Sequence, residues 1–166
     1  IQKDPLLASR LFDVPAEGYL GSRIDAGYNP VLIQEKRNAL LETLARELGS
    51  FCKDTYLELD PDNQKEFSQA MGVRALKNIM LMMMARQGDV DAFELAHQQY
   101  QTTRNMSERL GALKVLVWND APQAKEALAD FYTRFKDEAL SMDQWFMVQA
   151  AHPEATAATI AYLTSH

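Results

Sequence analysis

The chain has 166 residues, 47% of them hydrophobic, and a formal net charge of −6, which already excludes several classes of protein. This is enough apolar material for one domain with a buried core. The acidic balance argues against nucleic acid as the main partner, because phosphate binding needs clustered Lys and Arg. No apolar run reaches the roughly 20 residues of a membrane-spanning helix. Lys3 and Asp4 are not followed by the apolar core of a signal peptide, and the single Cys52 cannot form an internal disulfide. We therefore expect a soluble, cytoplasmic protein.

The first half of the chain predicts helices with recognisable starts. Asp4 can cap a short helix that has Pro5 in its first turn, and residues 15–24 form a weaker helix or turn. Asn29 should cap a long helix that ends near Leu59. One side of this helix is expected to be buried through its apolar residues, namely Ile33, Leu40, Leu41, Leu44, Leu48 and Phe51.

The second half continues the helical pattern with shorter connections. A helix over residues 63–86 contains the methionine-rich run 79–84, which is apolar on every side and therefore expected to be buried. Gly88 should end this helix and Asp89 should cap the next. Asn105 caps another helix, with Glu108 as its capping-box partner, and Asp120 and Pro122 start one more.

The stretch 140–153 predicts the last helical pair. Ser141 can act as an N-cap with Gln144 three residues later, so a helix is expected over residues 141–151. Trp145 lies on the bulky face of this helix and should be part of the core. Pro153 suits the first turn of a following helix, expected over residues 153–165.

No segment alternates with the period of a strand, and no Asn-Gly or Asp-Gly hairpin turn is present. Short connections from Asp89 onward predict that consecutive helices are antiparallel neighbours. The predicted fold class is all-α: an array of antiparallel helix pairs in one domain over residues 1–166. The chain stops within an apolar run, so we expect an array cut open at its C-terminal end. Ile160 and Leu163 should then lack a partner helix and favour self-association.

Three passages resemble one known family. The passage 140–150 reads Leu-Ser-Met-Asp-Gln-Trp-Phe-Met-Val-Gln-Ala and resembles a signature in the C-terminal helical region of bacterial aminopeptidase N. The passage 105–113, Asn-Met-Ser-Glu-Arg-Leu-Gly-Ala-Leu, resembles a second family segment. The passage 14–17, followed by Asn29-Pro30 and the helix that carries Arg37, resembles a third. The likeness runs in order over almost the whole chain and implies a superhelix of paired helices, similar to armadillo or HEAT repeats.

The resemblance also implies a function and a missing part. Aminopeptidase N enzymes are zinc-dependent and remove N-terminal residues from peptides, but this chain contains none of the family's catalytic sequence. The resemblance therefore implies a non-catalytic, excised C-terminal helical domain that walls off the active-site chamber and restricts access to small peptides. Its partners would be the catalytic domain of its own parent chain and the parent's peptide substrates. We expect it to be inactive by itself, with zinc only in the parent and no catalytic, cofactor-binding or metal-binding residue here.

The residues themselves offer no complete metal site. A zinc peptidase needs His-Glu-x-x-His on a helix, where two imidazoles share the metal and the glutamate activates water. Here Gln98 follows His97, Pro153 follows His152, and His166 ends the chain. The pair Glu94 and His97 has the spacing found in di-iron bundles, but a second such pair is missing. We interpret His97 as a partly buried packing residue with one hydrogen bond.

The remaining candidates have a functional interpretation beside a structural one. The run 60–63 hints at a calcium loop but lacks the required Gly and Glu, so helix capping is favoured. Methionines in the run 79–84 could form an adaptable binding surface, although core packing is favoured. Trp118 is either a stacking platform or a wedge at a helix end, and Cys52 is expected to be an inert buried thiol.

A second hypothesis is a free-standing helical-repeat module that binds partner peptides on a concave face. Such a module needs polar capping repeats at both ends, and the apolar C-terminal run argues against it.

Overall fold

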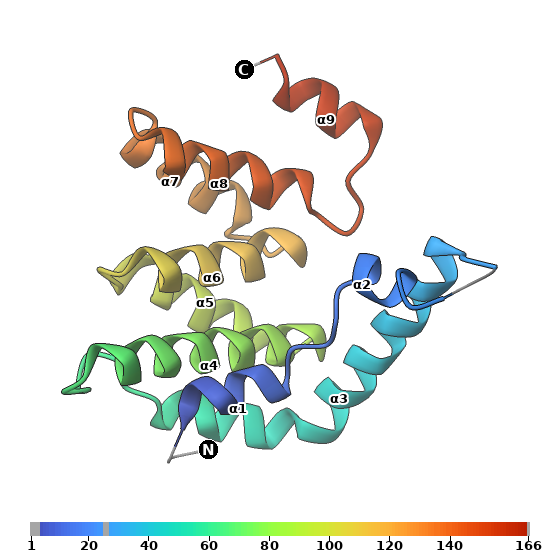
Figure 1. The fold of residues 1–166 in the computed structure, drawn as a ribbon. Helices are drawn as coiled ribbons and strands as arrows, with labels where there is room; N and C mark the ends of the chain where they lie inside the picture. Colours follow the sequence, from blue (N-terminus) through green and yellow to red (C-terminus); the bar gives the residue numbers. More distant parts are fainter. Residues whose placement is uncertain (1–3, 25–26, 166) are drawn as a thin grey trace. The chain divides into compact units, whose positions relative to one another are not determined.

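The computed structural model describes residues 4–24 and 27–165, which form helices and connecting turns without any strand (Figure 1). The predicted all-α fold is therefore confirmed. The helices of the described residues are α1 (Pro5–Leu11), α2 (Glu17–Gly21), α3 (Pro30–Glu58), α4 (Phe67–Arg86), α5 (Val90–Thr102), α6 (Met106–Trp118), α7 (Ala124–Phe135), α8 (Ala139–Ala150) and α9 (Ala157–Leu163).

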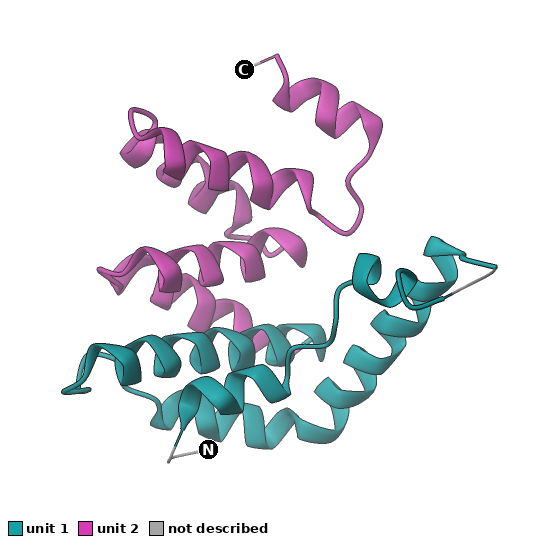
Figure 2. Ribbon diagram, in the orientation of Figure 1, with its two compact units in different colours: residues 1–88 teal, residues 89–166 magenta. Residues whose placement is uncertain are grey.

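The chain divides into two compact units, Ile1–Gly88 and Asp89–His166 (Figure 2). The expectation of a single domain over residues 1–166 stays a prediction. Among the described residues, no helix is both long enough and apolar enough to cross a membrane.

The first unit is built on the antiparallel pair α3 and α4, with α1 packed on α4 and α2 on α3 (Figure 1). Two side-chain caps begin its helices as predicted. The Leu7 amide donates to Asp4 Oδ1 at 2.9 Å, and the Leu32 amide donates to Asn29 Oδ1 at 3.1 Å. Each bond satisfies an amide that has no partner within its own helix.

The methionine-rich run of α4 is core, as predicted. Met80, Met83 and Met84 are buried, and Met82 is half-buried. Gly72, one helical turn before Leu76, lies where α1 crosses α4. A Cβ atom at Gly72 would lie 2.8 Å from the backbone nitrogen of Leu6, so α1 can approach this closely only because Gly72 has no side chain.

The expected buried side of α3 is partly wrong. Leu40 is 49% exposed and Phe51 is also exposed, whereas Leu41, Ala45 and Cys52 are buried. The buried stripe also contains Gly49. Small residues on this stripe let α4 come close, and the larger apolar side chains beside it are left at the surface.

The second unit is a succession of consecutive helices in contact: α5 with α6, α6 with α7, α7 with α8 and α8 with α9, and α6 also contacts α8. The predicted neighbour relations are confirmed. Gly88 (φ 76°) ends α4 in the left-handed conformation that favours glycine, and Asp89 caps α5 by accepting from the Asp91 amide at 3.0 Å.

Ring donors connect the helices of this unit. The Trp118 indole, at the end of α6, donates to the Val148 carbonyl of α8 at 2.8 Å. The Trp145 indole of α8 donates to the Leu128 carbonyl of α7 at 3.0 Å. Trp145 is 7% exposed, so its predicted place in the core is confirmed, and Trp118 acts as the predicted wedge at a helix end.

Three predicted helix starts are wrong in this unit. The helix α7 begins at Ala124, after a turn, and not at Asp120 and Pro122. The helix α8 begins at Ala139 with Glu138 as its N-cap, two residues before the expected start. Ala and Leu are strong helix formers, so the helix includes Ala139 and Leu140. Ser141 therefore lies within the first turn, where its hydroxyl donates to Glu138 Oε2 at 3.1 Å.

The expected helix over residues 153–165 is shorter, because α9 begins only at Ala157. His152 Nδ1 accepts a hydrogen bond from the Glu154 amide at 3.0 Å, and the Ala155 amide donates to the His152 carbonyl at 2.9 Å. These bonds hold a turn, and Thr156 then caps α9 with Thr159 as its capping-box partner.

The start of α4 is also later than predicted, at Phe67 rather than near residue 63. The Asp62 amide donates to Asp60 Oδ1 at 3.1 Å, and Gln64 Nε2 donates to the Asp60 carbonyl at 2.8 Å. Such local side-chain bonds compete with helix formation.

Candidate functional site

The motifs that carry the family resemblance hold the fold together. The Arg37 guanidinium on α3 donates to the carbonyls of Pro15 (2.9 Å) and Val14 (3.2 Å) and lies 3.5 Å from the Glu17 carboxylate. The passage 14–17 is thereby fixed to α3 by one side chain. The structure brings together two motif parts that are 20 residues or more apart in sequence, and their role is positioning.

The second motif fixes the joint between α5 and α6. Asn105 caps α6 as predicted, accepting from the Ser107 amide at 2.9 Å. The predicted capping box with Glu108 is wrong, because the Asn105 amide donates to Thr103 Oγ1 at 3.1 Å instead. Glu108 Oε2 accepts from the Thr103 hydroxyl at 3.2 Å. Arg109 donates to the Thr103 carbonyl. The Arg109 guanidinium also lies 5.7 Å from the ring centroids of Tyr100 and Phe135, within the range of a cation–π contact.

The pair Glu94 and His97 does not converge on a common point. Glu94 Oε1 accepts from Gln123 Nε2 at 2.8 Å, whereas His97 Nε2 lies 3.0 Å from Gln101 Nε2. His97 is half-buried, which agrees with its interpretation as a packing residue. Each of the two side chains therefore has a structural partner of its own.

Cys52 is fully buried in α3, and burial raises the pKa of its thiol. A raised pKa disfavours the nucleophilic thiolate, which agrees with the prediction of an inert thiol. Within the residues described by the structure, no group of three or more His, Cys, Asp or Glu is arranged to hold a metal ion.

A polar cavity of about 170 Å³ lies between α5 and α7, beside Tyr100. The Tyr100 hydroxyl donates to Asp130 Oδ2 at 2.8 Å and lies 3.0 Å from the Ala127 carbonyl oxygen. Arg134 pairs with the same Asp130 carboxylate at 2.8 Å. Burial and the Asp130 hydrogen bond raise the pKa of Tyr100. These groups satisfy one another, so the arrangement stabilises the fold.

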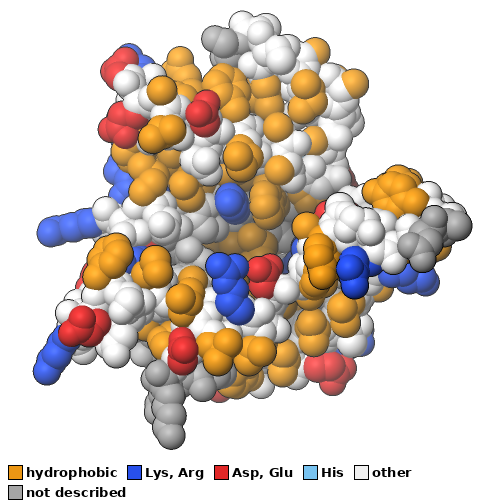
Figure 3. Space-filling view, viewed as in Figure 1, with side chains coloured by type: hydrophobic (Ala, Val, Ile, Leu, Met, Phe, Trp, Pro, Cys, Tyr) orange, Lys and Arg blue, Asp and Glu red, His pale blue; other side chains and the backbone are white. Residues whose placement is uncertain are grey.

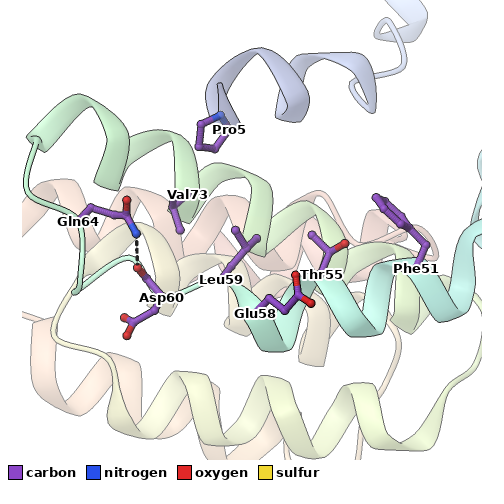
Figure 4. A pocket seen from close by; sticks show the side chains of 8 residues that line it. All are labelled: Pro5, Phe51, Thr55, Glu58, Leu59, Asp60, Gln64 and Val73. Carbon is purple, nitrogen blue, oxygen red and sulfur yellow. Dashed lines mark hydrogen bonds between the residues drawn. The ribbon is translucent and has the colours of Figure 1, made fainter. Parts of the chain in front are cut away.

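A larger cavity of about 300 Å³ lies in the first unit, at the C-terminal end of α3 (Figure 4). The sequence interpretation had singled out Asp60 there, but as a capping residue. The cavity is lined by residues of α1, α3, α4 and the turn after α3: Pro5, Phe51, Thr55, Glu58, Leu59, Asp60, Gln64 and Val73.

Comparison with known proteins gives consistent relatives. The chain is 28% identical to aminopeptidase N of Escherichia coli over 92% of its own length, and 27% identical to aminopeptidase N of Caulobacter vibrioides over 98%. It spans 17% and 19% of the length of these two curated relatives. The resemblance predicted from the sequence is confirmed.

A solved structure agrees with the fold. The crystal structure of Legionella pneumophila aminopeptidase A in complex with aspartic acid matches 98% of this chain and 20% of its own chain, with a TM-score of 0.79 and 23% identity. The family model described as a domain of unknown function (DUF3458_C) with ARM repeats matches residues 1–166. The helices of the described residues, their motif contacts and this match over the full length together show that the chain belongs to the DUF3458_C family of ARM-repeat domains.

Proposed function

We propose that the chain is the non-catalytic C-terminal helical domain of a zinc-dependent aminopeptidase N, which removes N-terminal amino acids from peptides. One observation carries the proposal: the chain matches aminopeptidase N relatives over 92% to 98% of its own length while spanning less than a fifth of theirs. A piece of this kind contributes a part of the enzyme, and the remaining four fifths provide room for the catalytic part.

Zinc would belong to the other part of the parent. The residues present do not fit a catalytic zinc site, which needs three protein ligands and an open position. The sequence has only three His residues and no His-Glu-x-x-His, and the described part of the chain offers no alternative cluster. This chain's own contribution is therefore structural: it would wall off the chamber, exclude water and restrict access to small peptides.

An exposed apolar surface supports packing against the catalytic domain of the parent chain. Figure 3 shows hydrophobic side chains on the lobe of the first unit that contains α2 and the beginning of α3, at the right, and also on the rest of this face. On α2, the beginning of α3 and the loop between them, the exposed apolar residues are Tyr19, Tyr28, Val31, Leu32 and Leu40. Exposed apolar surface of this kind supports an interface with another domain.

The C-terminal end gives weaker support for self-association. Leu163 is already buried by its own chain, so the expectation that it lacks a partner is wrong. It packs inward because α9 contacts α8. Ile160 of α9 is 44% exposed. We therefore keep the proposal of self-association only for the surface that contains Ile160.

A cytoplasmic location belongs to the same proposal and is supported by the lone, buried Cys52. The alternative is a free-standing helical-repeat interaction module, which the ARM-repeat match alone would also allow. The gene separates the two. An upstream His-Glu-x-x-His in the same reading frame supports the enzyme, whereas start and stop codons directly at residues 1 and 166 support the module.

The wall function is tested by deleting residues 1–166 from the full-length enzyme. We expect zinc to be retained, turnover of dipeptide-sized substrates to fall, and discrimination against long peptides to relax. The measurement is the ratio of kcat/KM for a short and a long substrate, together with zinc content. If the remainder folds and both substrates lose the same factor, the domain is only structural support.

A further inference from the structure

We propose that His152 makes the turn before α9 sensitive to pH: the neutral imidazole holds the turn closed, and protonation of the ring opens it and loosens α9. This joint lies within the second unit and is independent of the proposed function. Two observations carry the proposal, namely the hydrogen bonding of the His152 ring and the weak attachment of α9 to its neighbour.

The surroundings of the His152 ring determine which of its nitrogens carries the proton. Nδ1 accepts from the Glu154 amide at 3.0 Å, and a nitrogen that accepts must have a free lone pair. The proton of the neutral ring is therefore on Nε2. That nitrogen is buried, makes no hydrogen bond within the described residues, and lies 3.5 Å from Asp120 Oδ1. The neutral ring thus has its acceptor toward the turn and its donor toward Asp120.

The turn after α8 depends on this acceptor. The His152 amide donates to the Gln149 carbonyl at 3.3 Å, and the Ala155 amide donates to the His152 carbonyl at 2.9 Å. The third bond of the segment is the one from the Glu154 amide to the ring. Pro153 has no amide hydrogen with which to add another. Loss of the ring acceptor therefore removes one of these three bonds.

Protonation converts the acceptor into a donor. Histidine is the side chain that ordinarily gains a proton between pH 8 and pH 5, and an imidazolium carries hydrogen on both of its nitrogens. The Nδ1 hydrogen of a protonated His152 would then face the hydrogen of the Glu154 amide. Because neither group can accept, the bond between them is lost.

The charged groups around this joint do not restore the lost bond. Asp120, in the connection between α6 and α7, attracts the imidazolium at Nε2, but its side chain is 79% exposed and water weakens the attraction. Lys114 of α6 lies over the ring of Trp118, and α9 contains no charged residue. The charged residues of the turn, of α8 and of the start of α7 are exposed: Glu154, Asp143, Lys125 and Glu126.

The attachment of α9 is weak enough for one hydrogen bond to matter. This helix of seven residues contacts α8 (Figure 1), and Leu163 is its only buried residue. A segment with few buried contacts opens more readily than the rest of a fold. Loss of the bond at the turn should therefore increase the fraction of molecules in which α9 is open.

The test is NMR hydrogen exchange at residues 160–164 of the 166-residue chain, compared between about pH 5 and about pH 7.5. Protection factors correct for the intrinsic effect of pH on exchange. They should be about threefold lower at the acidic pH, as expected for the loss of one hydrogen bond. The Glu154 amide signal should also shift with the same midpoint as the His152 ring. Equal protection at both pH values, or a Glu154 amide that does not follow the ring, overturns the proposal.

Variants separate the His152 ring from other groups that titrate. In H152N the side-chain oxygen can still accept from the Glu154 amide, as in an Asx turn, but it does not titrate. Protection of α9 should therefore become independent of pH. The control H97N removes the histidine of α5 and should leave the pH dependence unchanged. A pH dependence that survives in H152N, or that H97N also abolishes, refutes the role of His152. If H152N fails to fold, the titration of the Glu154 amide in the unchanged chain decides.

Discussion

Replacing Trp145 by alanine tests how the second unit is held together. Trp145 is 7% exposed and its indole donates to the Leu128 carbonyl at 3.0 Å. Its ring also contacts Tyr132 and Phe146, with centroids 5.4 and 5.1 Å away. Truncating a buried tryptophan to alanine costs about 3–5 kcal/mol through lost burial and the cavity left behind. We therefore expect W145A to lower the unfolding free energy of this unit by that amount.

Two matched variants separate the contributions. W145F keeps an aromatic ring but loses the indole hydrogen bond, so it should cost about 1–2 kcal/mol. L140A changes the same helix at a side chain that is 82% exposed and should stay within about 0.5 kcal/mol.

The assay is urea unfolding followed by far-UV circular dichroism and by tryptophan fluorescence. The fluorescence probe lies in the second unit, so it isolates the relevant transition when the two units unfold separately. A cost below about 1 kcal/mol for W145A, with the other helices unchanged, would refute the inference that this indole anchors α8 to α7.

Three further predictions concern other contacts. G72A should destabilise by about 1–2 kcal/mol, because overpacking against the Leu6 backbone exceeds the gain in helix propensity. G18A, which meets no atom within 4 Å, is the control, and thermal unfolding compares the two. Y100F should make the unfolding free energy fall less steeply with pH in alkaline solution. The pKa of Tyr100 is raised in the folded protein, so the stabilisation from its hydroxyl is complete below the unfolded pKa of about 10 and is lost as pH rises above it. Denaturant titrations in which Y100F and the unchanged chain lose stability equally at alkaline pH would contradict this. Cys52 should react with a thiol reagent only as fast as the first unit opens, and a rapid stoichiometric reaction in the native state would contradict its burial.

Local signals explain the features that the sequence predicted well. Caps at Asp4, Asn29, Asp89 and Asn105 depend on a side chain and an amide two or three residues away, so the pattern alone is informative. The all-α class follows from the same local periodicity.

The missed features depend on contacts that the pattern does not contain. The helix α9 begins later than predicted because the His152 ring accepts from the Glu154 amide and holds a turn there. The prediction of an earlier start depended on Pro153 alone. The buried face of α3 follows small residues such as Ala45 rather than the larger Leu40, because close approach of α4 decides it. The cavity at the C-terminal end of α3 joins residues that are distant in sequence, including Pro5 and Val73, so no local window reveals it.

The indole bonds have a consequence for how such an array can change over time. Each donor is a ring nitrogen, but each acceptor is a main-chain oxygen of Leu128 or Val148. A carbonyl is present whatever side chain occupies the position. The Leu128 oxygen lies inside α7 and has a second lone pair beside its helical bond. The Val148 oxygen lies in the last turn of α8, where carbonyls have no partner within the helix. Substitution at position 128 or 148 by another helix former therefore keeps the bond, whereas substitution of Trp118 or Trp145 removes it. Neighbouring helices can exchange most of their apolar side chains and still keep the same rotation about their axes.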